Sequence, residues 1–171
     1  MNYFELFGLP IGFQVDTQKL RAAFMEIQKA THPDKFAQGD PEEQEAALEQ
    51  SSLANKGYTL LNQKERILPY VLEILGILTP DEKYALEPDF LMEMMDVNET
   101  IMDLQFDPDA EKLAQVKAEI ANVEQSLNNE LLSHTDRFPD ASQDQQEDRL
   151  IKIKDIYYRN KYIQRLKESL A

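Results

Sequence analysis

The residues of this 171-residue sequence best suited to chemistry are the consecutive His32, Pro33 and Asp34, which Lys35 follows. Imidazole and carboxylate groups serve in proton transfer and in directional polar binding. The only other histidine, His134, is expected to be an exposed helix-end residue rather than a ligand. The absence of cysteine excludes thiol nucleophiles and thiolate metal sites. There is also no Gly-rich phosphate loop and no paired-carboxylate motif, which disfavours an enzyme. We therefore expect no catalytic residue, no metal and no cofactor.

These three residues are predicted to lie in a loop between two helices. The first helix begins after Asp16 and carries an apolar face made of Leu20, Phe24 and Ile27. Pro33 must end it near His32, because proline disfavours helical geometry in the residue before it. A capped start follows, with Asp40 as the cap and Glu43 expected to complete a capping box. The inner face of this second helix is narrow and mostly small: Ala47, Ser51, Ala54, Tyr58 and Leu61.

The rest of the chain predicts further helices and a second domain. A short helix from about 64 to 75 ends at Gly76, and Pro69 inside it predicts a kink or a broken start. Three longer helices are expected at roughly 88–105, 108–137 and 143–170, and their apolar stripes can close a bundle. The predicted fold is all-α. It comprises an N-terminal domain (1–76) of an antiparallel helical hairpin plus short helices, a linker (77–87) and a C-terminal three-helix bundle (88–171).

Composition narrows the possible partners. The net charge of −14 opposes binding to nucleic acid, which requires clustered Lys and Arg residues. Residues 17–36 differ from the rest of the chain in being basic: they contain four Lys or Arg residues and two acidic residues, a net charge of +2. Such a face suits an acidic partner, or is simply solvated. No apolar run approaches the length of a membrane span, and the N-terminus lacks a signal-peptide pattern. We expect a cytoplasmic protein with neither a membrane nor a nucleic-acid partner.

The helix expected from residue 88 has a wide apolar arc. Its first stripe contains Phe90, Met94, Val97, Ile101 and Leu104, and an adjacent stripe contains Leu91, Met95 and Met102. The charged residues between 87 and 104 are all acidic: Glu87, Asp89, Glu93, Asp96, Glu99 and Asp103. An apolar strip rimmed by acids suits a partner surface, where methionine adapts well. In a three-helix bundle, however, a wide arc is more often core. The pattern alone leaves both interpretations open.

The first 76 residues resemble the J domain of co-chaperones. The resemblance rests on the opening Tyr-Phe-Glu-Leu-Phe-Gly-Leu at 3–9, on His-Pro-Asp-Lys-Phe at 32–36, and on 54–61 followed by Arg66 and Tyr70. Thr31, Gly57 and Pro69 depart from the family pattern. The resemblance implies docking on an HscA- or DnaK-type chaperone in its ATP state, with catalysis in that partner. The residues implied in this contact are His32, Pro33, Asp34, Lys35, Arg21 and Lys29.

The two domains together, with Phe-Leu-Met-Glu at 90–93, resemble the HscB family, J-proteins of iron–sulfur cluster biogenesis. In that family the C-terminal domain binds the cluster scaffold IscU and delivers it to HscA. The implied scaffold-binding residues are Leu91, Met92, Met95, Asp96, Glu99 and Tyr162. The absence of cysteine fits a carrier that binds the scaffold without holding the cluster. The alternative is a J-domain adaptor for a different client protein, which a pull-down with an IscU-type scaffold would separate.

Overall fold

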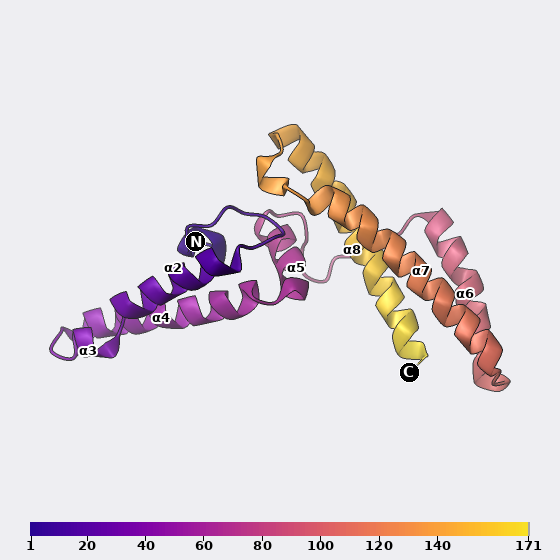
Figure 1. Ribbon diagram of the computed structural model, residues 1–171, viewed down its shortest axis with the longest axis horizontal. Helices are drawn as coiled ribbons and strands as arrows, with labels where there is room; N and C mark the ends of the chain where they lie inside the picture. Colours follow the sequence, from indigo (N-terminus) through magenta and orange to yellow (C-terminus); the bar gives the residue numbers. More distant parts are fainter. Residues whose placement is uncertain (171) are drawn as a thin grey trace. The chain divides into compact units, whose positions relative to one another are not determined.

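The computed structural model describes residues 1–170, and within them the chain is helical, without strands. Figure 1 shows α1 (Tyr3–Leu6), α2 (Thr17–Ala30), α3 (Pro33–Phe36), α4 (Pro41–Leu61), α5 (Lys64–Ile74), α6 (Pro88–Phe106), α7 (Ala110–Thr135), the 3-10 turn η1 (Phe138–Asp140) and α8 (Gln143–Ser169). The prediction of an all-α fold is confirmed. Two compact units form, one from residues 1–76 with 137–141, the other from residues 77–136 with 142 onward.

The first unit is built around a helical hairpin, in which α2 and α4 lie side by side (Figure 1). Asp16 begins α2 because its carboxylate accepts hydrogen bonds from two backbone N–H groups of the first turn. The rings of Phe24 on α2 and Tyr58 on α4 stack with centroids 4.2 Å apart. Ala54, which is fully buried, lets the two helices approach closely. The buried core of the unit is Phe4, Phe7, Leu20, Ala54, Leu61, Ile67 and Val71.

The short helix α1 packs on α4 at Gly57. A Cβ atom at residue 57 would lie 2.7 Å from Cδ1 of Tyr3 and 3.0 Å from Cε2 of Phe7. The backbone N–H of Tyr3 also donates a hydrogen bond to the hydroxyl of Tyr70, at 2.8 Å, which ties α1 to α5. Glycine at position 57, where the J-domain pattern favours alanine, is thus required by the close approach of α1.

The second unit is a bundle in which α7 packs against both α6 and α8 (Figure 1). Asp109 caps α7 by accepting hydrogen bonds from backbone N–H groups of its first turn. Ser142 and Gln145 form a capping box at the start of α8. The apolar stripes of the three helices meet in one core: Phe90, Met94, Val97, Ile101, Val116, Ile120, Leu127, Ile156, Ile163 and Leu166. The predicted three-helix bundle is confirmed.

The prediction that His32, Pro33 and Asp34 lie in a loop is wrong. Pro33 begins the one-turn helix α3, and His32 is its N-cap. The physical reason is that proline ends a preceding helix but is favoured at the first position of a new one, where its missing N–H costs nothing. The tip of the hairpin is therefore a fixed helical turn.

Three smaller predictions also need correction. Pro69 does not produce a broken start, because α5 runs from Lys64 to Ile74 with Pro69 inside it and Val71 buried beside it, while the alternative of a kink stays a prediction. Asp40 caps α4 through the backbone N–H of Glu42, and the capping boxes lie at α1 and α8 instead. His134, predicted to be exposed, has only 17% of its side chain exposed. It follows Leu127 and Leu131 at helical spacing, so it lies at the edge of the face of α7 that packs inward.

Residues 137–141, which connect α7 to α8, belong to the first unit. Phe138 is 2% exposed, and its ring meets the ring of Phe13 edge to face with centroids 5.0 Å apart. The chain enters this turn through Arg137, which has a φ of +50°. The sequence predicts residues 138–141 to be the connection between two helices of the C-terminal domain, and its pattern gives no sign of this packing.

Candidate interaction surfaces

His32, Pro33 and Asp34 lie at α3, at one end of the helical hairpin (Figure 1). The Nδ1 atom of His32 accepts a hydrogen bond from the backbone N–H of Asp34, at 3.2 Å. In a neutral imidazole an accepting Nδ1 places the proton on Nε2. The side chains of His32 and Asp34 are 60% and 92% exposed. The Nε2–H donor and the Asp34 carboxylate therefore both face solvent, where a partner can reach them.

A groove of about 490 Å³ opens beside this tip, between α3 and α4. Its lining includes Pro33, Phe36, Ala47, Leu48 and Ser51. The side-chain amide of Gln44 donates to the carbonyl groups of Phe36, at 2.9 Å, and of Gly39, at 3.2 Å. These bonds fix the segment after α3 on α4. Because Leu48 is exposed at the groove, apolar surface lies directly next to the polar tip.

The basic residues predicted to support the tip are all exposed, but they lie at different distances from it. Lys35 belongs to α3 itself. Lys29 is in the last turn of α2, and its Nζ atom lies 4.0 Å from Glu26, a weak surface pair. Arg21 precedes His32 by eleven positions, or about 16 Å along a helix. The structure thus brings Lys29 and Lys35 close to the tip and leaves Arg21 about three turns away.

The apolar arc of α6 divides into a buried stripe and an exposed one. Phe90, Met94, Val97 and Ile101 are buried in the bundle core. The exposed stripe contains Leu91 (37%), Met92 (66%), Met95 (57%), Met102 (58%) and Phe106 (87%). The first stripe is therefore core, whereas the second is free of the core and its role as a partner surface stays a prediction. Phe106 was missed in the sequence, although its spacing of four residues from Met102 was a usable signal.

Acidic side chains border this exposed stripe. Asp96 and Glu99 are exposed and lie among the apolar residues at helical spacing. Along the whole of α6 there is no Lys or Arg residue. Charges on one helix face that are all negative attract a partner of opposite charge and repel a like one. The face thus combines adaptable apolar side chains with a negative rim.

Tyr162, the remaining predicted scaffold-binding residue, is half-buried on α8. The side-chain amide of Asn98 on α6 donates to its hydroxyl at 2.7 Å. Its ring also meets the ring of Phe90 edge to face, with centroids 5.9 Å apart. The structure therefore joins Tyr162 to the buried side of α6, and not directly to the exposed stripe. Its role in scaffold binding stays a prediction.

The second unit also contains a cavity away from α6. This cavity of about 340 Å³ lies between α7 and α8 and is lined by Ile120, Leu170 and the Lys167–Glu124 ion pair, among others. In the part of the chain that the structure describes, no group of three or more His, Asp or Glu side chains is arranged to hold a metal ion. Among the same residues, no helix is both long and apolar enough to span a lipid bilayer.

Comparison with known proteins shows consistent similarity. Residues 86–171 match a family model described as the HSCB C-terminal oligomerisation domain. A co-chaperone protein HscB homologue from Colwellia psychrerythraea is 30% identical over 172 residues, covering 99% of this chain and 98% of the relative. The structure of chaperone HscB from Vibrio cholerae is similar with a TM-score of 0.52 and 28% identity, covering all of both chains. Human co-chaperone HscB shares the fold, with a TM-score of 0.61 and 24% identity over 98% of this chain and 81% of that one.

The class of protein that the fold and these relatives define is a co-chaperone, with an N-terminal J domain and a C-terminal helical domain. The relative from Colwellia is similar along nearly its whole length, and the family model spans the C-terminal half of this chain. The chain therefore belongs to the HscB family of co-chaperones.

Proposed function

We propose that this chain stimulates the ATPase of an HscA/DnaK-type chaperone through its J domain and delivers an IscU-type scaffold through its C-terminal domain, so that it supports maturation and transfer of iron–sulfur clusters. Membership of the HscB family supports both parts. The observation that carries the proposal is the exposure of His32 and Asp34 on a fixed turn at the end of the hairpin. We assign chaperone docking to residues 1–76 and scaffold binding to 88–171, and we place the activity in the cytoplasm.

At the tip, the proposed role is to shift the population of chaperone conformations. A protein that binds one conformation more tightly than another shifts their equilibrium by that difference in affinity. The turn at α3 presents the Nε2–H of His32 as a donor and the carboxylate of Asp34 as an acceptor. Lys29 and Lys35 add positive charge that favours an acidic chaperone surface. ATP is hydrolysed in the chaperone, so this chain acts as a regulator and not as an enzyme.

On α6, the exposed stripe is the proposed scaffold-binding surface. Removing such side chains from water favours association, and the part that exceeds the freedom lost on binding appears as affinity. The flexible side chains of Met92 and Met95 adapt to an irregular partner. The acids Asp96 and Glu99 favour a scaffold whose apolar patch is bordered by Lys or Arg residues. In this view, the negative rim selects the orientation while the apolar stripe provides most of the affinity.

The test is ATP turnover by an HscA-type chaperone and by a DnaK-type chaperone, each measured alone, with this chain, and with this chain plus an IscU-type scaffold. We expect this chain to accelerate turnover by at least one of them, and the scaffold to accelerate it further. An unchanged rate with both chaperones would contradict the J-domain assignment. Acceleration that is insensitive to the scaffold, together with no binding in a pull-down, would instead support an adaptor for another client.

A further inference from the structure

Residues 77–86 are part of the second unit. They turn at Thr79–Glu82, where Asp81 has a φ of +59°, and residues 82–86 then lead into α6. Their side chains alternate: Glu82, Tyr84 and Leu86 are half-buried, whereas Asp81, Lys83 and Ala85 are exposed. This period of two is what an extended segment produces when one of its faces is covered. Leu78, earlier in the segment, is also buried. We call residues 77–86 the strap.

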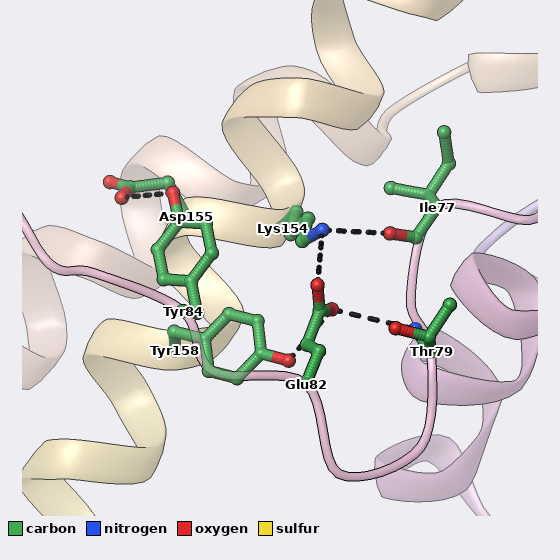
Figure 2. Close-up of polar contacts among 7 residues, drawn as sticks. All are labelled: Ile77, Thr79, Glu82, Tyr84, Lys154, Asp155 and Tyr158. Atoms are coloured by element: carbon green, nitrogen blue, oxygen red, sulfur yellow. Dashed lines mark hydrogen bonds and ion pairs between the residues drawn. The ribbon is translucent and has the colours of Figure 1, made fainter.

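The strap binds α8 through Glu82, which contacts Lys154 (Figure 2). The ammonium group of Lys154 donates to the carboxylate of Glu82 and to the backbone carbonyl of Ile77, both at 2.9 Å. The hydroxyl of Tyr158 donates to the other carboxylate oxygen of Glu82, at 2.8 Å. Only about a fifth of the Lys154 and Glu82 side chains is exposed, so solvent screens this pair less than a surface pair.

A second series of contacts connects the strap, through side chains of α8, to α6. The rings of Tyr84 and Tyr158 stack, with centroids 4.4 Å apart and planes 7° from parallel. The hydroxyl of Tyr84 donates to the carboxylate of Asp155 at 2.8 Å, as Figure 2 shows. The other oxygen of Asp155 lies 2.7 Å from Nε of Arg159. The guanidinium group of Arg159 in turn covers the ring of Phe90, 5.0 Å from its centroid.

The start of α6 has no side-chain cap. Glu87 occupies the N-cap position, but its side chain makes no capping hydrogen bond. Pro88 follows at the first helical position, and the backbone N–H of Leu91 makes its helical bond to the carbonyl of Glu87 at 3.1 Å. An uncapped first turn frays easily unless tertiary contacts hold it. Leu91 and Met92, the first residues of the exposed stripe, lie in this turn or directly after it.

We propose that the strap positions the first turn of α6, and that Glu82 and Lys154 are positioning residues for the partner-binding face that begins at Leu91 and Met92. Loss of Lys154 leaves the carboxylate of Glu82 with fewer donors and releases the carbonyl of Ile77, so the strap detaches and the first turn of α6 frays. The positioning of α6 stands on the contacts described above. The consequence for scaffold affinity rests on the proposed function.

The experiment compares the full-length chain with Lys154→Met, Lys154→Arg and Lys152→Met. Hydrogen exchange is followed at Leu91–Met94 and in the middle of α7, and limited trypsin cleavage is followed at Lys83, which is exposed in the strap. Binding to an IscU-type scaffold is measured by calorimetry. Lys152 is an exposed neighbour on α8 that pairs with Asp148, so its variant controls for the loss of one positive charge.

For Lys154→Met we expect about tenfold faster exchange at Leu91–Met94 and faster cleavage at Lys83, with the middle of α7 unchanged. Scaffold affinity should fall about tenfold, Lys154→Arg should restore each value, and Lys152→Met should match the parent chain. Unchanged exchange at Leu91–Met94 would overturn the positioning role. Faster exchange with unchanged scaffold affinity would overturn its link to binding. Failure of the parent chain to bind the scaffold would count against the proposed function, while the exchange data would still decide the role of the strap.

Discussion

The imidazole Nδ1 of His32 lies 3.2 Å from the backbone nitrogen of Asp34 and accepts its N–H. His32 therefore caps α3, a role usually taken by Ser, Thr, Asp or Asn. In a neutral ring, accepting at Nδ1 leaves the proton on Nε2. One side chain thus caps the tip while 60% of it stays exposed, which a simple helix stop does not explain.

The first prediction is that His32→Gln and Asp34→Asn each abolish stimulation of the chaperone ATPase while folding and scaffold binding are retained. Both side chains are largely exposed, so neither supports the core. The measurement is ATP turnover by the chaperone at a fixed concentration of each variant. Normal stimulation by either variant would refute the assignment of the tip.

His32→Asn separates the two roles of the histidine. Asparagine is a strong N-cap, so this variant should keep α3 but lose the Nε2–H donor. We expect it to stimulate as poorly as His32→Gln. If His32→Asn were instead as active as the parent chain, the histidine would act only as a cap.

The fold was predictable from the sequence because its elements follow local rules. Apolar residues at helical spacing predict the helix that contains Leu20 and Ile27, and they predict the C-terminal helices in the same way. Proline and glycine then mark where helices end. The errors arise where two rules compete at one residue. Pro33 ends one helix and also begins the next, and Pro69 is tolerated because buried neighbours hold α5.

The candidate surfaces were predictable in type but not in extent. The motif at His32 consists of consecutive residues, and the stripe that begins at Leu91 lies on a single helix. Both can therefore be found from sequence spacing alone. The contacts of Lys154 and Tyr158 with Glu82 join residues more than seventy positions apart. Nothing in the pattern of residues 77–86 indicates which helix would receive them. Such contacts depend on tertiary packing, which a single sequence does not specify.

The second prediction concerns the exposed stripe of α6. Leu91→Ala combined with Met95→Ala should weaken scaffold binding about thirtyfold, since each of the two apolar contacts is expected to contribute on the order of 1 kcal/mol. Met95→Ala should change stability little because Met95 is 57% exposed, whereas Leu91→Ala should cost about 1 kcal/mol because only 37% of Leu91 is exposed. Calorimetric titration with the scaffold measures the effect. Ile151→Ala, which removes an exposed apolar side chain from α8, is the matched control, and an equal loss in both variants would contradict a surface specific to α6.

The third prediction is that the binding face continues to the end of α6. Leu91 and Phe106 are fifteen positions apart, about 22 Å along the helix, a length that a standard interface can cover. Phe106→Ala should therefore weaken scaffold binding about tenfold, because its ring is 87% exposed in the free chain and would become buried. A scaffold affinity equal to that of the parent chain would limit the face to the first turns of α6.

The fourth prediction follows from Tyr84. Burial, and then its hydrogen bond to the carboxylate of Asp155, raise the pKa of Tyr84 to about 12. A pKa raised in the folded state gives a contribution to stability that is fully present below about pH 10, the unfolded value, and is lost as the pH rises toward 12. The tyrosinate absorbance difference between the parent chain and Tyr84→Phe should report this late ionisation. In Asp155→Asn the same titration should move toward lower pH, and an unchanged titration would contradict the contact.

The fifth prediction tests the packing of α1 on α4. Gly57→Ala should destabilise the first unit by about 1 kcal/mol. The gain in helix propensity of about 1 kcal/mol is outweighed by overpacking, which typically costs about 1–3 kcal/mol. The added Cβ would lie 2.7 Å and 2.9 Å from atoms of the Tyr3 ring, too close for α1 to keep its place. Urea unfolding of the full chain measures the effect, and Tyr3→Ala should remove most of it in a double-mutant cycle. A net stabilisation by Gly57→Ala would show that α1 does not pack against this position.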